Sequence, residues 1–313
     1  MPVGRHCPTM TATSGLLTDP ATIPDVEAFD PRPPFSSVLF ATARQFTVDY
    51  DINPYMEGGV DTGRANDQWD RLVERYEDLA DVSVLDVDEV WDEMAGEAAV
   101  PPDRLPDLVF CANHALPLPG SDRFVISQMA TDERRHEPRY FRRWAERTGR
   151  TVEELHTDAA FEGAGDARWH PGRRLLWGGH GPRTDLEAYE ELAERFDVPV
   201  VPLELTDDAY YHLDVCFSAL DERTALVCPD AFTDAGRAKL TALFETLIEV
   251  SPAAARRALA CNCHSVDGET VVIDAGNAET AERLESHGYE TVTVRTDEFI
   301  KAGGSVACMA LPH

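Results

Sequence analysis

The sequence predicts an α/β fold, because short apolar runs typical of strands alternate with longer segments of helical periodicity. The expected strands are 38–40, 82–85, 108–110, 124–126, 175–177, 198–203, 225–228, 270–273 and 291–294. The expected helices, which carry apolar residues three and four positions apart, are 137–147, 185–196, 234–249 and 278–287. Gly288 follows the last of them, where a glycine commonly ends a helix. The alternation leaves open whether the sheet is open or closed into a ring, and no fixed repeat length is visible.

The first residues differ in composition from the rest. Residues 1–34 contain several prolines, with Pro31, Pro33 and Pro34 close together, and few large apolar side chains. Such a segment buries too little apolar surface to form a core of its own. We therefore expect a mobile N-terminal extension over 1–34 and a single catalytic domain over 35–313, which is long enough to bury a large core.

The chain is strongly acidic. Asp and Glu number 57 against 28 Lys and Arg, giving a formal net charge of −29, and Lys239 and Lys301 are the only lysines. This charge argues against nucleic-acid binding and against docking on anionic membranes, since both need a basic surface. It favours a halophilic protein, kept soluble in strong salt where charge repulsion is screened. The alternative is an ordinary acidic cytosolic enzyme.

Cysteine usage indicates a reduced, cytoplasmic enzyme. The seven cysteines are an odd number without a CxxC pair, and no run of 18 apolar residues is present. Cysteine and histidine pairs do not fall at zinc-finger spacing, so we expect no metal. Gly178-Gly179-His180-Gly181 reads as a turn, and it lacks the lysine of a phosphate-binding loop, so we expect no nucleotide cofactor.

Three short segments carry the groups of a cysteine-nucleophile hydrolase. They are Gly303 to Met309, Phe161 to Asp166 and Tyr211 to Asp214. Cys308 follows two glycines, which let the backbone turn tightly and leave a thiol facing a cleft. His212 is the candidate general acid and base, and Asp214 would share its face if the segment is a strand.

Together with Asp51 to Met56 and Asp107 to Asn113, these segments resemble the guanidino-group-modifying (pentein) superfamily. The resemblance runs from about Ser37 to the C-terminus and is nearest the branch of arginine dihydrolases, amidinotransferase-like proteins and dimethylarginine dimethylaminohydrolases. It implies a five-bladed, pseudo-symmetric α/β propeller with the site at its centre. It also implies a small arginine-type substrate, a covalent thiol adduct and no cofactor.

The resemblance assigns expected roles to residues around the thiol. Glu162 would contact substrate nitrogens or orient the histidine, Asp214 would hold the planar guanidinium, and Asp166 would be structural. Asn113 stands where the deiminases of the superfamily have an aspartate; as in the arginine dihydrolase branch, its amide can meet a guanidinium nitrogen or a ureido oxygen. Two alanines depart from the family pattern: Ala307 replaces a basic residue common before the cysteine, and Ala164 replaces a glycine.

Four more residues complete the expected substrate pocket. Arg183 and Arg134 are candidates to hold the α-carboxylate of the substrate. Asn53 is either a pocket residue or a turn-forming Asn-Pro, and Phe46 would cover the substrate. No chemistry is assigned to Asn262.

The predicted function is therefore hydrolysis of the guanidino or ureido group of arginine or a close derivative, with release of ammonia. Two alternatives use the same site, an amidinotransferase and a dimethylarginine dimethylaminohydrolase. A non-catalytic amino-acid-binding protein is a third reading. A homo-oligomer is compatible with the sequence.

Overall fold

The computed structural model describes residues 15–56, 58–97 and 99–313, which fold into five small sheets that follow one another along the chain. The first sheet contains β16 (Leu311–Pro312), β2 (Ser37–Ala41) and β3 (Asp81–Leu85); the second, β4 (Ala115–Pro117), β5 (Arg123–Ile126) and β6 (Thr151–Glu153); the third, β7 (Ala167–Trp169), β8 (Leu176–His180) and β9 (Pro199–Glu204); the fourth, β10 (Phe217–Ala219), β11 (Thr224–Val227) and β12 (Thr246–Glu249); the fifth, β13 (His264–Ser265), β14 (Thr270–Asp274) and β15 (Glu290–Val294).

All five sheets share one topology. The first-named strand of each sheet, here called its leading strand, is antiparallel to the middle strand. The middle strand is parallel to the third strand. A helix makes each parallel crossover, as a parallel pair requires. These helices are α1 (Thr62–Glu77), α3 (Pro138–Arg147), α5 (Leu186–Phe196), α6 (Asp234–Leu243) and α8 (Ala278–Ser286).

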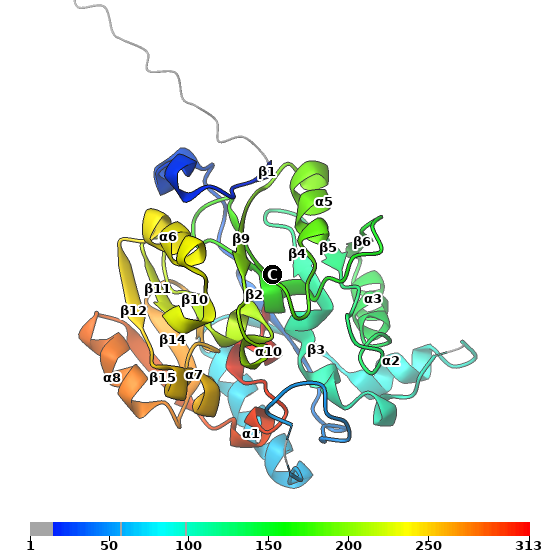
Figure 1. Ribbon diagram of the computed structural model, residues 1–313. Coiled ribbons are helices and arrows are strands. Elements are labelled where there is room, and N and C mark those ends of the chain that lie inside the picture. The colour runs from blue at the N-terminus through cyan, green and yellow to red at the C-terminus, as the bar shows by residue number, and fades with distance from the viewer. Residues whose placement is uncertain (1–14, 57, 98) are drawn as a thin grey trace, which may run out of the picture.

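The two ends of the domain close the ring of sheets. Leu311 of β16 pairs with Leu39 of β2, so the C-terminal strand becomes the leading strand of the first sheet. Figure 1 shows the crossover helices at the periphery and the C-terminus near the middle of the molecule. This is the five-bladed α/β propeller that the resemblance implies. The leading strands β4, β7, β10, β13 and β16 begin at residues 115, 167, 217, 264 and 311, so the structure contains a repeat of similar length that the sequence did not reveal.

Shorter helices connect one sheet to the next. They are α2 (Val87–Glu93), η3 (Pro102–Arg104), η4 (Pro106–Val109), η5 (Cys111–His114), α4 (Gly163–Asp166), η6 (Asp208–Tyr210), η7 (Leu213–Val215), α7 (Pro252–Ala258), α9 (Asp297–Ile300) and α10 (Val306–Met309), where η denotes a 3₁₀-helix. Another 3₁₀-helix, η8 (Pro229–Ala231), lies between β11 and α6. Along the part of the chain that is described, no helix is both long enough and apolar enough to cross a membrane.

Most predicted strands and helices are confirmed, with two exceptions. The apolar run 108–110 is not a strand but belongs to η4 and the turn after it, because Pro106 at the first helical position favours a helical turn. The predicted helix 234–249 ends at Leu243, and Thr246 to Glu249 form β12 beside β11. Phe244 adopts extended backbone there, and its ring is buried against Trp177.

The N-terminal prediction is wrong for residues 15–34, which pack on the domain. In β1 (Gly15–Leu16) the chain pairs with β9 as a fourth strand of the third sheet. After η1 (Pro20–Thr22) and η2 (Val26–Ala28), Phe29 is 1% exposed within the apolar core. The burial of Phe29 anchors this segment, although its proline-rich composition did not indicate that it packs on the core. Residues 1–14 of the predicted extension lie outside the described residues.

Candidate active site

Five connecting segments meet at the centre of the ring, and each lies just before a leading strand. Asn113 lies in η5 before β4, Glu162 precedes α4 and β7, and His212 precedes η7 and β10. Asn262 lies two residues before β13, and Cys308 lies in α10 before β16. Contacts join η5 to α4 and α10, and α4 to η7. The fold thus gathers residues separated by almost 200 positions in the sequence.

The thiol of Cys308 is buried and hydrogen-bonded on two sides. Its side chain is 2% exposed. Sγ donates to Oδ2 of Asp214 at 3.2 Å and accepts from Nδ2 of Asn262 at 3.1 Å. Burial, and then the charge of Asp214, raise the pKa of the Cys308 thiol well above its usual range. In the absence of substrate the sulfur is therefore a neutral thiol, and Ala307 supplies no cation beside it.

Asn262 is the site residue that the sequence did not reveal. Its Oδ1 accepts backbone N–H groups from Ser305, Ala307 and Cys308 at 3.1, 3.1 and 3.3 Å. Its Nδ2 also donates to the carbonyl of Asp214 at 3.2 Å. One buried amide thus fixes the turn that carries the thiol. The only signal in the sequence was its place before a strand, which matches the place of the other site residues.

The two glycines before the cysteine are required by their surroundings. Gly303 has a φ of 91°, and its carbonyl accepts the hydroxyl of Tyr211 at 2.7 Å. At Gly304 a Cβ would lie 2.3 Å from the ring of Phe110. The tight turn expected from the sequence is therefore confirmed, and this turn at Gly303 and Gly304 positions Cys308.

His212 and Glu162 form the shortest polar contact of the site. Nε2 of His212 lies 2.6 Å from Oε2 of Glu162, and both residues are almost fully buried. Burial alone would raise the pKa of Glu162, but the hydrogen bond and charge of His212, with Arg183 and Arg134 nearby, lower it to about 2. With Nε2 donating to this carboxylate, Nδ1 of His212 is left as the basic nitrogen, and it has no partner in the described chain.

The segment holding His212 and Asp214 is not the predicted strand. His212 is the residue before η7, and the helical turn of η7 separates it from the side chain of Asp214. Asp166 secures this turn, since its carboxylate accepts the N–H of Leu213 at 2.9 Å and the hydroxyl of Thr184 at 2.7 Å. Its contacts agree with the structural role expected. Burial raises the pKa of Asp166 to about 6 and also raises the pKa of Asp214.

Asn113 is oriented by an arginine. Nη1 of Arg134 donates to Oδ1 of Asn113 at 3.0 Å, so Nδ2 is the free end of the amide and has no partner among the described residues. The rest of the Arg134 guanidinium is bound by Glu137 and the carbonyl of Asp107. These contacts orient Asn113, and the role of Arg134 as a clamp for the α-carboxylate stays a prediction.

Arg183 lies closer to the reacting groups. Nη1 lies 3.3 Å from Oε2 of Glu162, Nη2 donates to the carbonyl of Ile52 at 2.7 Å, and the guanidinium lies over the ring of Tyr211. Contrary to the turn that we predicted, Gly178 to His180 are the second half of β8. Arg183 follows the end of that strand, and its role as a carboxylate clamp stays a prediction.

Asn53 and Phe46 flank the segment that leads to the thiol. Asn53 donates to the carbonyl of Ala302 at 3.0 Å and accepts the N–H of Tyr55 at 2.9 Å, so it bridges a turn and the site segment. Phe46 is 1% exposed and packs against Phe110 and Phe299. It lies in the same apolar cluster as Cys308, and whether it covers the substrate stays a prediction.

Asp214→Asn is expected to make the Cys308 thiol more reactive. The carboxylate of Asp214 repels the negative charge of a thiolate, so the neutral amide should lower the thiol pKa and raise the thiolate fraction at pH 8. Alkylation of Cys308 by iodoacetamide, followed by peptide mass spectrometry, should accelerate about tenfold for each pKa unit. An unchanged or slower rate would contradict this electrostatic account.

Asn262→Ala is expected to destabilise the protein by about 1–3 kcal/mol, because it leaves three backbone N–H groups without their acceptor. Urea unfolding measures this loss. Asn66→Ala is the matched control, since the Asn66 amide makes one exposed bond within α1. Equal losses in the two variants would show that Asn262 does not hold the turn.

Comparisons with known proteins place this site in context. Residues 98–313 match the family described as N,N dimethylarginine dimethylhydrolase, eukaryotic. The dimethylarginine dimethylaminohydrolase of Mycobacterium tuberculosis is 36% identical over 85% of this chain and 82% of its own length. A bifunctional arginine dihydrolase/ornithine cyclodeaminase of Nostoc is 35% identical over 87% of this chain. The match spans 37% of the length of that bifunctional relative.

Solved structures show the same similarity as the sequence relatives. The N-terminal domain of a cyanobacterial arginine dihydrolase superposes with a TM-score of 0.79 at 32% identity, covering 88% of this chain and 97% of that domain. A dimethylarginine dimethylaminohydrolase structure at 23% identity shares the fold, with a TM-score of 0.71. The chain therefore belongs to the dimethylarginine dimethylaminohydrolase family, within the guanidino-group-modifying superfamily that its motifs resemble.

Proposed function

We propose that this protein is a cysteine-nucleophile hydrolase of the guanidino and ureido groups of arginine-type amino acids. The observation that carries the proposal is the convergence of Cys308, His212, Glu162, Asp214 and Asn113 at the centre of the ring. A thiol, an imidazole and two buried carboxylates are the groups that this chemistry needs. The cyanobacterial dihydrolase supports it, because structures of that protein include a cysteine-to-serine mutant bound to substrate and a variant covalently bound to a reaction intermediate.

Substrate binding would activate the nucleophile. A guanidinium brings a delocalised positive charge to a site that holds the carboxylates of Glu162 and Asp214. Oδ1 of Asp214 is buried and has no partner in the described chain, so it can accept a guanidinium N–H. The cation lowers the thiol pKa, and the proton of Cys308 can leave toward Nδ1 of His212. The site thus forms its thiolate only when it is occupied.

The proposed reaction needs only water besides the substrate. The sulfur of Cys308 bonds to the guanidino carbon, and the C–N bond to one terminal nitrogen breaks as His212 gives that nitrogen a proton. Ammonia leaves, and a thiouronium adduct remains on the cysteine. His212 takes a proton from water, the resulting hydroxide attacks the same carbon, and the C–S bond breaks to give citrulline and free enzyme.

Asn113 favours a second turnover on citrulline. The guanidinium of Arg134 occupies Oδ1, so the amide presents donors, which suit a ureido oxygen and not a guanidinium N–H. A second attack by Cys308 on citrulline would release another ammonia, and hydrolysis of the adduct would give ornithine and carbon dioxide. We therefore favour an arginine dihydrolase.

A second candidate is a dimethylarginine dimethylaminohydrolase, which the family match and the mycobacterial relative favour. It would use the same thiol and imidazole and release dimethylamine. An amidinotransferase would pass the amidine to an amine in place of water. A binding protein without catalysis is the least supported, because it would need neither the His212–Glu162 pair nor a thiol beside the Asp214 carboxylate.

Product analysis distinguishes these candidates. Purified protein incubated with arginine or citrulline is expected to yield ornithine and ammonia, whereas Cys308→Ser should lose at least 10³-fold in rate. Asn113→Asp is the matched test of the second step: it should turn arginine over but accumulate citrulline, because a carboxylate cannot donate to the ureido oxygen. Dimethylamine from dimethylarginine alone would establish the second candidate, and turnover only with added amine would establish a transferase.

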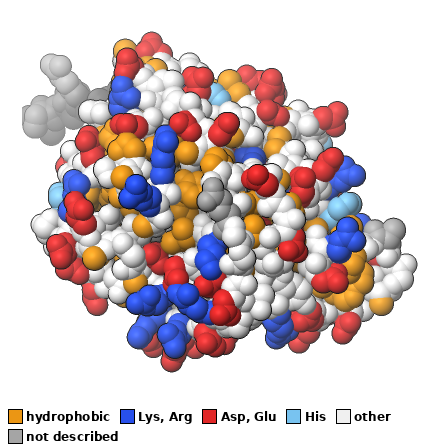
Figure 2. Space-filling view, turned by 60° about the horizontal axis from the view of Figure 1, so that its bottom comes forward, with side chains coloured by type: hydrophobic (Ala, Val, Ile, Leu, Met, Phe, Trp, Pro, Cys, Tyr) orange, Lys and Arg blue, Asp and Glu red, His pale blue; other side chains and the backbone are white. Residues whose placement is uncertain are grey.

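We also propose that the protein works in a reduced, cytoplasmic and salt-rich environment. The six cysteines in the described residues are all free thiols. Asp and Glu number 57 against 28 Lys and Arg, and Figure 2 shows side chains of both kinds spread over one face of the molecule. Such a surface repels itself at low ionic strength.

Thermal unfolding should therefore depend on salt. Between 0.1 M and 2 M KCl the melting temperature is expected to rise by roughly 10 °C or more, because the Debye length falls from about 10 Å to below 3 Å. Sucrose at matched water activity is the control, since it stabilises folded proteins without screening charge. A melting temperature independent of KCl would contradict the halophilic assignment.

A further inference from the structure

A second cavity lies at the opposite end of the ring from Cys308. It encloses about 370 Å³, which is within the size range of small-molecule sites. Residues at the far ends of leading strands line it, including Pro117, Trp169, Ala219, Ser265 and Pro312. The leading strands begin beside the active-site segments and end here, so they run between the two sites. None of the proposed active-site residues lines the cavity.

Two guanidinium groups face this cavity without a carboxylate partner. Arg168 donates to the carbonyl of Ala164, and Arg32 donates to the carbonyls of His170 and Pro33. Neither arginine forms an ion pair within the described residues. Burial lowers the pKa of Arg32 to about 10, so it keeps its charge at neutral pH. In a chain with 57 acidic and 28 basic residues, two half-buried arginines without acids are an unusual arrangement.

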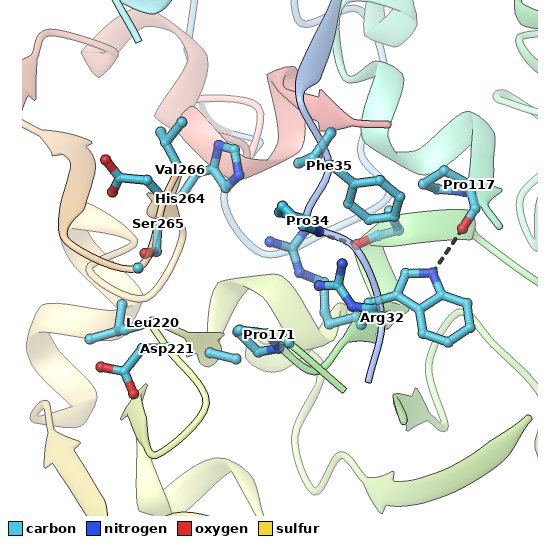
Figure 3. Close-up of a pocket in the computed structure, with 18 of the residues that line it drawn as sticks. Arg32, Pro34, Phe35, Pro117, Pro171, Leu220, Asp221, His264, Ser265 and Val266 are labelled. Carbon is cyan, nitrogen blue, oxygen red and sulfur yellow. Dashed lines mark hydrogen bonds between the residues drawn. The ribbon is translucent and has the colours of Figure 1, made fainter. Parts of the chain in front are cut away.

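The rest of the lining is mostly apolar. Figure 3 shows Arg32 beside Pro34, with the ring of Phe35 and Pro117 on one side and Ser265 and Val266 across the cavity. Oγ of Ser265 is buried and has no hydrogen-bond partner in the described chain. A buried hydroxyl without a partner is costly, and a ligand acceptor would satisfy it.

Three carboxylates also belong to the lining, but each is engaged. Glu222 pairs with Arg173, and Asp221 accepts N–H groups of its own turn and the hydroxyl of Tyr289. Asp267 accepts N–H groups within the β13–β14 turn. In Figure 3, Asp221 lies on the side of the cavity away from Phe35 and Pro117. These carboxylates are therefore held by other groups, whereas Arg32 and Arg168 have no carboxylate partner in the described chain.

We propose that this cavity binds a small organic carboxylate whose apolar body packs against Phe35, Pro117 and Trp169. The carboxylate would accept N–H groups from Arg32 and Arg168 and the hydroxyl of Ser265. Planar guanidiniums match carboxylates in geometry, and the apolar wall favours an organic anion over an inorganic one.

Arg168 also connects this site to the thiol. It donates to the carbonyl of Ala164 in α4, the helix that Glu162 precedes and that contains Asp166. Burial raises the pKa of Asp214, and the charges of His212 and then Arg168 oppose that effect. A bound carboxylate would offset the charge of Arg168.

Calorimetric titration of the full chain with phenylacetate tests the proposal. At constant KCl, one molecule per chain should bind saturably, and equally well in Cys308→Ser. Arg168→Gln and Arg32→Gln should each weaken binding about tenfold or more, and Arg168→Lys less. Arg257→Gln, an exposed change on α7 outside the cavity, should bind as the native chain does. Trp169→Phe should remove any change in tryptophan fluorescence on binding.

Two further probes separate the parts of the ligand. 2-Phenylethanol has the apolar body without the charge, and inorganic phosphate has charge without the body; both should bind at least tenfold more weakly than phenylacetate. Equal binding of either probe would overturn the assigned ligand class. Native affinity in folded Arg168→Gln, or displacement of phenylacetate by arginine, would overturn the site itself. These readouts measure binding, so they stand apart from the enzymatic activity.

Discussion

The pairing of the C-terminal strand β16 with β2 is the contact on which the site depends. It joins residues from the two ends of the domain, Leu311 with Leu39, and places α10 at the centre of the ring. Cys308 lies three residues before this strand. If the pairing were lost, the thiol would leave the imidazole and carboxylates, which are held by other sheets. Closure of the fold and assembly of the site are therefore a single event, in which the Asn262 amide fixes the final turn.

The electrostatics of the centre follow from burial. Glu162 and Asp214 are almost fully buried, and a buried carboxylate needs a cation or hydrogen-bond donors. Glu162 has them in His212 and Arg183, whereas Asp214 accepts one hydrogen bond from the thiol and keeps its other oxygen without a partner in the described chain. The free site thus holds negative charge that only a cation can balance. In the function proposed above, a guanidinium would meet that need and by the same charge would turn the thiol into a nucleophile, so that binding and activation would have one cause.

The local sequence predicted most of the strands and most of the candidate site residues, but not all of them. Cys308, His212 and Glu162 stand in short motifs whose chemistry can be read directly, and strands such as 270–273 follow from β-branched runs. Asn262 could not be identified, because its function is to bind backbone groups of a segment more than 40 residues away. The contact of Arg134 with Asn113, 21 residues away, was hidden for a similar reason. Long-range partners decide such roles, and a motif contains only one side of the contact.

The ring also explains why one molecule can offer two sites. Each leading strand begins at a residue of the active site and ends near the second cavity, so both ends of the ring axis receive side chains from every sheet. At the first end these side chains are acids, an imidazole and a thiol. At the second end Arg32 and Arg168 have no carboxylate partner in the described chain, and Asp221, Glu222 and Asp267 belong to the same lining. Because Arg168 also bonds to α4, a change of charge at one end reaches the carboxylates at the other through a single side chain. The short leading strands separate the two sites while keeping them within electrostatic reach.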